Sequence, residues 1–404
     1  MSPIRIAAIA SHAVQYQAPW YRALAQVADL RVFFAHRATA DDQGRAGFGV
    51  PFEWDVPLLD GYPHEWLTNV AARPGVGTFL GCDTPGIADR LGAGRFDAVV
   101  VNGWQLLSYW QAIRAARTLR IPVFVRGDSQ LNAERPGIRA VKRVLYPRLL
   151  KAFDGCLTVG VRNREYYERY GVPNDRLWPA PHAVDNAFFA RAATQAREPF
   201  GQARARFGIP QGRTVFLLAA RLVEMKRPLD FVRAVHAAHA ARSDVHGLIV
   251  GDGPLRGALE GEARSLGAPC TFAGFLNQRE IGVAFAAADA LVLTSDGRET
   301  WGLIVNEAMA AGLPALVSQA AGCAPDLVVH GETGFVFSCG DVAALARLMQ
   351  GAGRAGLAAL GRRAAARIEL YSPEAAAAGT VAAVRETLAR RSAAITRNPD
   401  HAAA

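Results

Sequence analysis

The segment Thr214-Val215-Phe216-Leu217-Leu218-Ala219-Ala220-Arg221-Leu222-Val223-Glu224-Met225-Lys226-Arg227-Pro228 passes from an apolar run through a charged turn to a proline. The run Thr214–Ala220 predicts a buried parallel strand, because strands covered on both faces are apolar throughout. Pro228 suits the first turn of a helix, which the pattern extends to Ala241. The next apolar run, His246–Val250, predicts a second strand. This order is typical of an α/β fold with a parallel sheet.

The same alternation of apolar runs and helical stretches fills both halves of the chain. Before Thr214 the runs are separated by segments such as Leu106–Leu119, whose apolar spacing is helical. After it they are separated by helical segments that end near Leu266 and Ala288. The two series predict two doubly wound, Rossmann-like domains. The other expected strands are Ile4–Ala10, Leu30–Phe34, Ala98–Val101, Pro122–Val125, Cys156–Val159, Thr271–Phe275, Ala290–Leu293 and Ala315–Val317.

The domain boundaries follow from where this pattern is interrupted. We expect an N-terminal domain over residues 1–190 and a C-terminal domain over 191–372, with the linker near 178–200. That stretch contains Pro179, Pro181 and Pro199 and has no long apolar period. An alanine-rich helix over 373–391 is expected to pack back on the N-terminal domain, and the tail 392–404 to be disordered.

Composition narrows the class of protein. The 404 residues are 51% hydrophobic and 20% charged, a balance typical of folded globular proteins and not of disordered chains. The formal net charge of +9 favours anionic partners: nucleotide phosphates, nucleic acid or an acidic membrane surface.

The cysteines and the N-terminus bear on the compartment. The five cysteines are odd in number and have no metal-binding spacing, so we expect reduced thiols in a cytoplasmic protein. The apolar start is short and has no basic leader, which predicts a first strand and not a signal peptide. The sequence contains no run of 18 apolar residues, so we expect no membrane span.

The segment after the strand Ala290–Leu293 suits a sugar nucleotide. It contains two carboxylates, Glu299 and Glu307, on either side of an expected helix start near Gly302. Backbone N–H groups of Gly302 and Leu303 could bind a phosphate, and each carboxylate could accept hydrogen bonds from sugar or ribose hydroxyls. The alternative is a surface helix with two solvated acids. The segment reads Gly297-Arg298-Glu299-Thr300-Trp301-Gly302-Leu303-Ile304-Val305-Asn306-Glu307-Ala308-Met309-Ala310-Ala311-Gly312-Leu313-Pro314.

Two further turns are expected at the same edge of the sheet. Arg221 and Lys226 follow the strand Thr214–Ala220, where open α/β sheets bind ligands. Two cations there could neutralise a diphosphate and the negative charge left on it as a glycosidic bond breaks. Exposed basic residues beside a turn are the alternative. The glycine-rich turn at 251–254 follows the next strand, and by itself predicts no more than a tight turn.

Together these elements resemble the C-terminal domain of the retaining glycosyltransferases of family 4. The resemblance implies the GT-B fold, in which two Rossmann-like domains face each other across a cleft. The resemblance covers about 214–340 and rests on the order and spacing of several short elements. It implies that Arg221 and Lys226 hold the diphosphate, Glu307 the ribose and Glu299 the donor sugar, with Phe275–Asn277 facing the base. Trp301, where relatives often have Phe, is expected to pack the donor loop. The other matching elements are Gly251-Asp252-Gly253-Pro254, Ala273-Gly274-Phe275, Gly302-Leu303 and Gly331-Glu332-Thr333-Gly334-Phe335.

The N-terminal half resembles this family less closely. In place of a glycine-rich loop after the first strand, His12, Gln15 and Tyr16 form a His-x-x-Gln-Tyr pattern seen in some bacterial members. These side chains are expected to face the cleft and to bind acceptor or phosphate; the alternative is a capping histidine and core aromatics. Relatives often carry a histidine after a middle strand, whereas here Arg126 and Asp128 follow it and are candidates for contacting the sugar. His182 is a further cleft candidate, with a structural turn as its alternative.

The helical stretch 137–153 is distinguished by its charge. It contains Arg139, Lys142, Arg143, Arg148 and Lys151 and no acids, beside an apolar stripe. It could lie on an anionic membrane or meet a lipid-linked phosphate. The alternative is a solvated helix whose stripe packs on the sheet.

The residues and the resemblance together predict an enzyme: a retaining glycosyltransferase that moves a hexose-type sugar from a nucleoside-diphosphate sugar to a glycan, lipid-linked or small-molecule acceptor. UDP or GDP donors are expected, with a role in bacterial surface polysaccharide or glycoconjugate synthesis and a cytoplasmic location, peripheral at the inner face of the membrane. No cofactor and no metal are expected, because two cations and backbone amides can stabilise the leaving diphosphate. The alternatives are a nucleotide-sugar epimerase of the same fold and a basic nucleic-acid-binding protein, although no RNA motif or recognition helix supports the latter.

Overall fold

The computed structural model describes residues 3–44, 51–131, 136–197 and 202–397. The chain forms two compact units. Unit 1 comprises residues 1–38, 58–182 and 373–404, and unit 2 comprises 39–57 and 183–372. The division between the halves falls after His182, a few residues before the expected boundary at 190.

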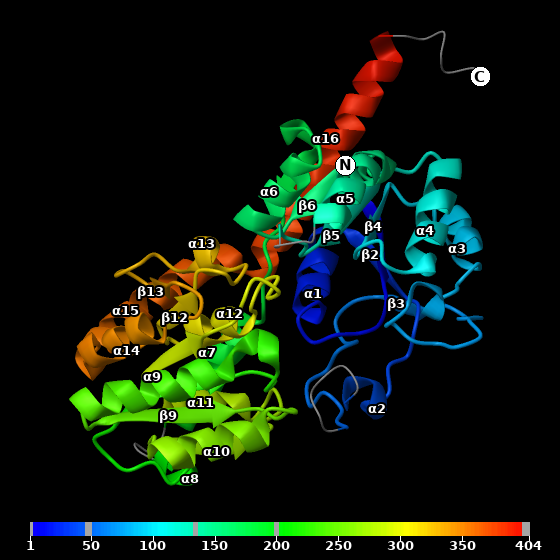
Figure 1. The fold of residues 1–404 in the computed structure, drawn as a ribbon. Coiled ribbons are helices and arrows are strands. Elements are labelled where there is room, and N and C mark those ends of the chain that lie inside the picture. The colour runs from blue at the N-terminus through cyan, green and yellow to red at the C-terminus, as the bar shows by residue number, and fades with distance from the viewer. Residues whose placement is uncertain (1–2, 45–50, 132–135, 198–201, 398–404) are drawn as a thin grey trace. The chain divides into compact units, whose positions relative to one another are not determined.

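Unit 1 is built on a seven-stranded parallel sheet with the order β3-β2-β1-β4-β5-β6-β7 (Figure 1). The central strands are almost fully buried, as their continuous apolar sequences predict. In register, Ile9 lies beside Phe33 on one side and Val101 on the other. The strands are β1 (Arg5–Ala10), β2 (Asp29–Phe34), β3 (His64–Trp66), β4 (Ala98–Val101), β5 (Val123–Gly127), β6 (Gly155–Thr158) and β7 (Leu177–Pro179).

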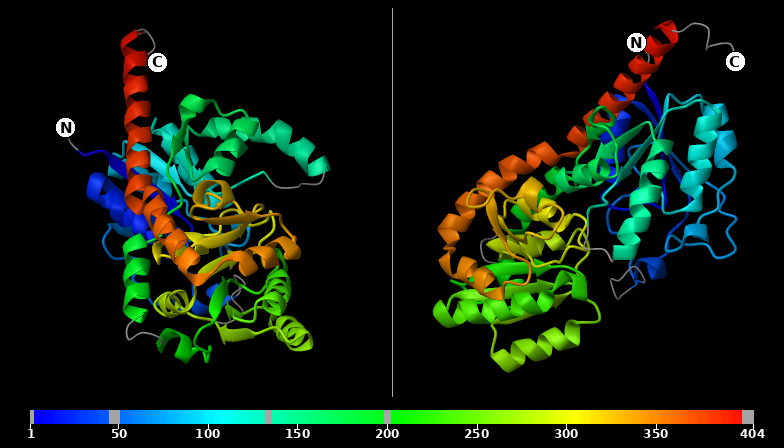
Figure 2. Two further views of the ribbon diagram at one scale, coloured as in Figure 1. Left: turned by 90° about the vertical axis from the view of Figure 1, so that its left-hand side faces the viewer. Right: turned by 45° about the horizontal axis from the view of Figure 1, so that its top comes forward.

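Helices connect and cover these strands. The last helix of the chain packs against α1 and β7 in this unit, and Figure 2 shows it as one long helix. Gly379 permits this approach, because a Cβ there would lie 1.8 Å from the carbonyl oxygen of Pro179. The helices are α1 (Ala18–Val27), α3 (Ile87–Gly94), α4 (Leu107–Thr118), α5 (Pro136–Leu149), α6 (Val161–Arg169) and α16 (Pro373–Arg397), with 3₁₀ turns η2 (Phe79–Gly81), η3 (Leu150–Ala152) and η4 (Asn174–Arg176).

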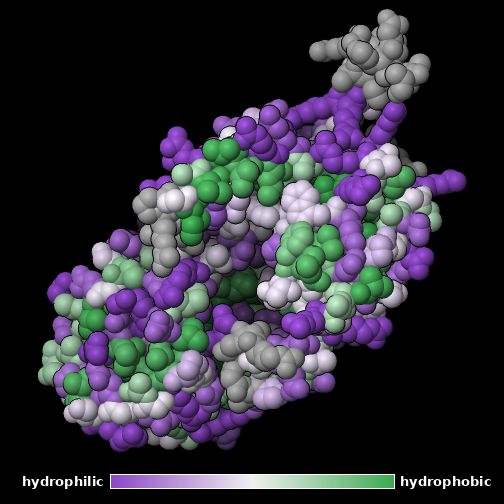
Figure 3. Space-filling view, turned by 45° about the vertical axis from the view of Figure 1, so that its right-hand side comes forward, coloured by the Kyte–Doolittle hydropathy of each residue, from purple (hydrophilic) through white to green (hydrophobic). Residues whose placement is uncertain are grey.

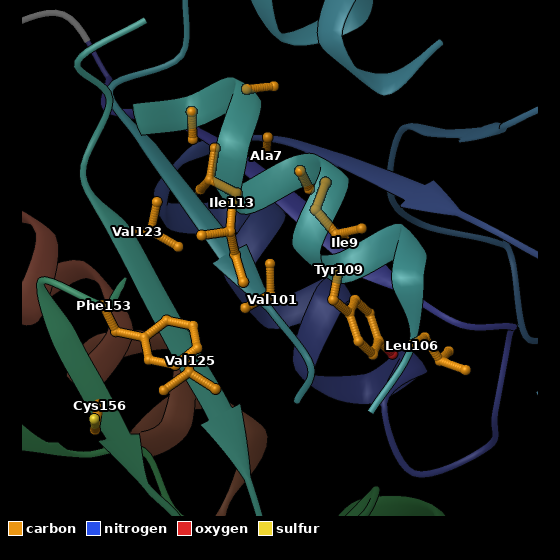
Figure 4. Close-up of a cluster of buried hydrophobic side chains, with 14 of the residues drawn as sticks. Ala7, Ile9, Val101, Leu106, Tyr109, Ile113, Val123, Val125, Phe153 and Cys156 are labelled. Atoms are coloured by element: carbon orange, nitrogen blue, oxygen red, sulfur yellow. The ribbon is translucent and has the colours of Figure 1, made fainter. Parts of the chain in front are cut away.

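The core of unit 1 has a layer on each face of the sheet. On one face, Tyr109 and Ile113 of α4 point toward Ile9, Val101 and Val125 of the strands (Figure 4). On the other face, α1 and α16 cover the opposite side chains of the same strands. This alternation of faces along each strand fixes the register, since a slip by one residue would exchange the two layers.

Unit 2 is built on a six-stranded parallel sheet with the order β10-β9-β8-β11-β12-β13. The order reverses between β8 and β11, which is the switch point where open α/β sheets bind ligands. Its strands are β8 (Thr214–Ala219), β9 (Val245–Val250), β10 (Cys270–Gly274), β11 (Ala290–Leu293), β12 (Ala315–Ser318) and β13 (Gly334–Phe337). Its helices are α2 (Ala40–Gln43), α7 (Asn186–Ala196), α8 (Gln202–Arg206), α9 (Pro228–Ala241), α10 (Arg256–Leu266), α11 (Ile281–Ala287), α12 (Ile304–Ala310), α13 (Ala324–Leu327), α14 (Val342–Gly351) and α15 (Arg354–Ile368), with 3₁₀ turns η5 (Glu224–Lys226) and η6 (Glu369–Tyr371).

Two expectations about the chain's organisation need correction. The expected linker at 178–200 contains regular structure: β7 ends at Pro179, and α7 spans most of the remainder. Pro179 is compatible with a strand here because β7 is an edge strand. The last helix continues to Arg397, beyond its expected end at 391, so 392–397 are helical; residues 398–404 lie outside the described residues.

Candidate functional site

The predicted donor residues follow parallel strands of unit 2 at one edge of its sheet. Arg221 and Lys226 follow β8, the glycine turn 251–254 follows β9, and Glu299 follows β11. Because all these strands are parallel, their carboxyl ends lie on the same side. The loops are also bonded to one another: Leu222 N–H donates to the Asp252 carbonyl at 2.8 Å, and Asp296 N–H donates to the Met225 carbonyl at 2.8 Å.

Lys226 and Glu299 form an ion pair within this loop cluster. The ammonium of Lys226 contacts Oε2 of Glu299, and the two side chains are 12% and 11% exposed. The hydroxyl of Ser295 donates to the same carboxylate oxygen at 3.0 Å. The Thr294 hydroxyl donates to the backbone carbonyl of Lys226 at 2.6 Å, which ties η5 to the loop after β11. A buried carboxylate is thereby held by a cation and a hydroxyl, as burial of charge requires.

Glycines fix the backbone around Glu299. Gly302 has φ +105°, and a Cβ there would lie 2.8 Å from Cδ2 of Leu293. Gly322 follows β12, and a Cβ there would lie 1.8 Å from the carbonyl oxygen of Thr300. Gly322 N–H also donates to the Glu299 carbonyl at 3.0 Å. The expected helix begins at Ile304, two residues after Gly302, so the amides of Gly302 and Leu303 precede its first turn.

Glu307 differs from Glu299 in its surroundings. It lies on α12, partly buried, and its carboxylate makes no hydrogen bond or ion pair to any residue in the described part of the chain. Burial raises the pKa of Glu307 to about 8. An ionised carboxylate in such a place is costly unless a ligand supplies hydrogen-bond donors. Two vicinal hydroxyl groups, as on a ribose, are donors of that kind.

The turn after β9 brings the chain close to Arg221. Gly251 has φ +126°, and a Cβ there would lie 1.9 Å from the carbonyl oxygen of Ala220. Asp252 in this turn is paired with Arg256 at 2.6 Å. The backbone just before Arg221, which is partly buried, is thus approached so closely that only glycine fits at position 251. The turn has a close-approach role that its sequence alone did not show.

The predicted base-facing residues contact a segment from the first half of the chain that belongs to unit 2. The rings of Phe275 and Phe52 are 4.7 Å apart between centroids. The side-chain amide of Asn277 donates to the Glu53 carbonyl at 2.7 Å. Trp301 is 3% exposed and its indole N–H donates to Asn306 at 2.8 Å, which agrees with a role in packing the loop.

In unit 1 the structure brings three of the predicted residues together. The guanidinium of Arg126, 5% exposed, lies 4.5 Å from the centroid of the Trp20 ring and donates to the Pro181 carbonyl at 3.0 Å. Tyr16 meets the ring of His182 edge-on at 6.0 Å. Burial, and secondarily Arg126, holds the pKa of His182 well below its usual value, so this imidazole is neutral. Burial lowers the pKa of Arg126 to about 10, which leaves it charged at neutral pH.

The remaining candidates of unit 1 lie around this group. His12 Nδ1 is 2.9 Å from the Ser11 hydroxyl, directly after β1. Gln15 lies partly exposed in the turn before α1. Asp128 follows β5 and, after burial, is the next cause that raises the pKa of Tyr16 to about 12. All these residues therefore belong to the carboxyl ends of strands of unit 1 or to the turns that follow.

The sequence reasoning missed the residues that support Glu299. Thr294, Ser295 and Gly322 were not among the candidates, although the first two hold the Lys226–Glu299 pair and the third holds the backbone. Thr294 and Ser295 directly follow the apolar strand β11 and are 1% and 0% exposed. Two hydroxyls at the end of a buried strand, next to a charged loop, were a usable signal. Gly322 had none.

Comparisons with known proteins assign this part of the chain to a family. Residues 200–352 match the model of the glycosyl transferases group 1. These residues are therefore a group 1 glycosyltransferase domain, and the two parallel-sheet units give the whole chain the GT-B fold.

Individual proteins show the same similarity. The chain is 42% identical over 96 residues to the sulfoquinovosyl transferase SQD2 of Arabidopsis thaliana, which covers 23% of this chain and 18% of that protein. It is 34% identical over 191 residues to the D-inositol 3-phosphate glycosyltransferase of Streptomyces avermitilis, 44% of this chain and 41% of that one. The chain thus spans less than half the length of either relative. The structure of HepE from Anabaena in complex with UDP and glucose is similar with a TM-score of 0.67 and 18% identity, over 96% of this chain and 99% of that one.

Proposed function

We propose that the protein is a retaining glycosyltransferase that transfers a hexose-type sugar from a nucleoside-diphosphate sugar to a glycan, lipid-linked or small-molecule acceptor. The observation that carries this proposal is that unit 2 has two carboxylates, Glu299 and Glu307, in unlike surroundings. Glu299 is buried and paired with Lys226, whereas Glu307 is partly buried and has no partner among the residues that the structure describes. Similarity to a structure that contains UDP and glucose supports a donor of this kind.

Each residue has a definite task in the proposed reaction. Arg221 and Lys226 neutralise the diphosphate and stabilise the charge that it gains as the bond to the anomeric carbon breaks. The amides of Gly302 and Leu303 contribute to the same stabilisation. Because these groups supply the positive potential, the reaction requires no divalent metal, and UDP and GDP donors fit it equally.

The two carboxylates orient the donor. Glu307 accepts hydrogen bonds from the ribose hydroxyls, and Glu299 accepts them from hydroxyls of the transferred sugar. Phe275 and Asn277 contact the base, and Trp301 keeps the loop in place. Retention follows if the leaving phosphate itself guides the acceptor to the face it has left, a step for which no carboxylate nucleophile is needed.

The acceptor is assigned to unit 1. Arg126, His182 and Tyr16 form a buried polar group there, and His12, Gln15 and Asp128 lie around it. The cationic Arg126 beside a neutral imidazole suits an acceptor with an anionic or hydroxyl group. A cytoplasmic enzyme of bacterial surface polysaccharide or glycoconjugate synthesis, at the inner face of the membrane, is the biological setting we propose.

Binding of nucleotides tests the proposal directly. Thermal-shift and calorimetric titrations with UDP, GDP, ADP and dTDP, and with their sugar conjugates, should show saturable stabilisation by one nucleoside diphosphate. Glu307→Ala and Lys226→Ala should both weaken it, whereas Arg298→Ala, a control at an exposed arginine of the same loop, should not. A folded wild type that binds none of these nucleotides would refute the proposal, and salt-sensitive nucleic-acid binding in its place would favour the rival class.

A further inference from the structure

Helix α5 presents an apolar face that the described residues of its own unit leave exposed. Ile138, Val141, Val144 and Leu145 are 51%, 56%, 56% and 54% exposed. Ile138, Val141 and Leu145 follow the i, i+3, i+7 spacing, so they lie on one face of the helix. Figure 3 shows the hydrophobic side chains gathered over α5. Val141, Val144 and Leu145 of the apolar stripe are therefore exposed, whereas Leu149 and Leu150 at its C-terminal end pack on the core of unit 1.

The helix is nevertheless anchored at its C-terminal end. Tyr146 packs against Tyr170 with centroids 5.0 Å apart and against Trp104 at 6.3 Å. The following Leu150 is buried in the core of unit 1. The C-terminal end of α5 is thus fixed to unit 1, while its preceding turns expose an apolar face. The fixed end gives this face a defined orientation.

The charge beside the apolar face has one sign. Residues 137–153 contain five basic side chains and no acid. Arg139, Lys142 and Arg143 follow the i, i+3, i+4 spacing, so they share a face next to the apolar one. The ammonium of Lys142 also lies 5.3 Å from the centroid of the Tyr146 ring, which places a cation close to the fixed C-terminal end of the helix.

These features select one occupant among those that could cover an apolar helix face. Arg139, Lys142 and Arg143 form what we call the basic row. If two copies of α5 packed on each other about a two-fold axis, their basic rows would come together, and the helix has no acid to offset this repulsion. An anionic lipid surface supplies both partners at once, because its acyl region accepts the aliphatic side chains and its phosphates meet the basic row.

We infer that α5 is an in-plane membrane anchor that binds anionic phospholipid through Ile138, Val141, Val144, Leu145 and the adjacent basic row. The inference deepens the proposed function and rests on it for the acceptor: an enzyme held in this way would meet acceptors carried by lipids. Peripheral binding of this kind needs no membrane-spanning helix, and none of the described helices is long and apolar enough to be one.

Vesicle flotation of the full-length protein tests the inference. The protein should float with phosphatidylcholine vesicles that contain phosphatidylglycerol and should stay behind with phosphatidylcholine alone. Val141→Ser/Leu145→Ser and Arg139→Glu/Arg143→Glu should each reduce partitioning by about tenfold or more. Raising the salt concentration should weaken the wild type as well, since the basic row acts through charge.

Matched controls carry the same chemical changes elsewhere. Phe79→Ser/Leu80→Ser changes two apolar side chains that are 48% and 66% exposed in unit 1, and Arg114→Glu/Arg385→Glu makes the same change in net charge on exposed positions. Both controls should float like the wild type. Equal loss in the controls, or flotation unaffected by the α5 variants, would overturn the inference. So would dimers in light scattering that Val141→Ser/Leu145→Ser dissociates, because the occupant would then be a second copy.

The nucleotide titrations separate this inference from the proposed function. The α5 variants should bind nucleoside diphosphates as the wild type does, because α5 belongs to unit 1 and the donor residues belong to unit 2. If vesicles bind and nucleotides do not, the membrane anchor stands and the glycosyltransferase proposal fails. If nucleotides bind and vesicles do not, the opposite holds.

Discussion

Lys226 and Glu299 neutralise each other in a place where both are almost completely buried. Lys226 is on η5 after β8 and Glu299 is in the loop after β11, so the pair joins the two strands between which the sheet order reverses. In the proposed reaction each member also contacts the donor, the ammonium at the diphosphate and the carboxylate at the sugar. The pair is therefore both a structural clasp and a preorganised part of the site.

Removing one member of this pair should cost more than removing both. Lys226→Met leaves the Glu299 carboxylate buried without its cation, which should destabilise the protein by about 3–5 kcal/mol. Lys226→Met/Glu299→Gln should recover most of that loss but should still not bind a nucleoside diphosphate. Arg164→Met is the control, because Arg164 pairs with Glu168 where the two side chains are 39% and 40% exposed, and it should cost about 0–1 kcal/mol. Urea unfolding measures the first effect and calorimetry the second; a Lys226→Met protein as stable as the wild type would contradict the clasp.

Glu307 should make the stability of the protein depend on pH. Its pKa is raised to about 8, so between pH 5 and 8 the folded protein keeps a proton that the unfolded chain has released. Stability from this group is therefore fully present at lower pH and falls as pH rises, by up to about 1.4 kcal/mol per pH unit. Glu307→Gln should remove this dependence and should unfold at higher denaturant concentration than the wild type at pH 8. Identical pH profiles for the two proteins would show that Glu307 titrates normally.

Nucleotide binding should release a proton from the same carboxyl group. Hydrogen bonds from ribose hydroxyls favour the ionised form of Glu307 and lower its pKa, so below about pH 8 binding expels the proton. Affinity for the nucleoside diphosphate should accordingly rise as pH approaches 8. Calorimetry at pH 7 in two buffers with different ionisation enthalpies should give different binding enthalpies for the wild type. For Glu307→Gln the two enthalpies should agree. Equal enthalpies for the wild type as well would show that Glu307 does not bind the ribose.

The sequence predicted the fold well where strands are fully buried. Ala290–Leu293 was placed to the residue and Thr214–Ala220 to within one residue, because continuous apolar runs admit few alternatives. The strands that were missed, β3, β7 and β13, have only three or four residues, and β3 (His64–Trp66) is also polar. Such edge strands are defined by pairing with a neighbour, which no local pattern reveals.

The site was predictable in its residue types but not in its electrostatics. Charged residues after buried strands made Lys226 and Glu299 candidates, and the expected helix start near Gly302 added Glu307. The pairing of Glu299 with Lys226 depends on a contact between the loops after β8 and β11, and the two residues are 73 apart in the chain. Whether the apolar face of α5 is exposed could not be decided from the sequence either, because an amphipathic pattern shows that an apolar stripe exists and not what covers it.

Gly302 should not tolerate a side chain. Its φ of +105° is strained for any other residue, and an added Cβ would lie 2.8 Å from Leu293. Gly302→Ala should destabilise the protein by about 1–3 kcal/mol and displace the loop that carries Glu299, so that nucleotide binding weakens as well. Gly297→Ala is the matched control in the same loop, because a Cβ there meets nothing within 4 Å. Its effect should stay within about 0.5 kcal/mol, and equal effects of the two substitutions would show that the Gly302 conformation is not required.

Arg126 should separate acceptor use from donor binding. The guanidinium is buried in unit 1 against Trp20 and close to the Tyr16–His182 contact, whereas every proposed donor residue lies in unit 2. Arg126→Met keeps the apolar packing and removes the charge, so thermal unfolding should show a folded protein. Once an acceptor is in hand, its kcat/KM should fall by about tenfold or more, because a charge-assisted contact is lost, while the affinity for the nucleoside diphosphate should not change. Arg117→Met, on the surface of the same unit, should leave both quantities as they are. A variant at Arg126 that loses donor affinity in the same proportion would mean that this arginine binds the nucleotide and not the acceptor.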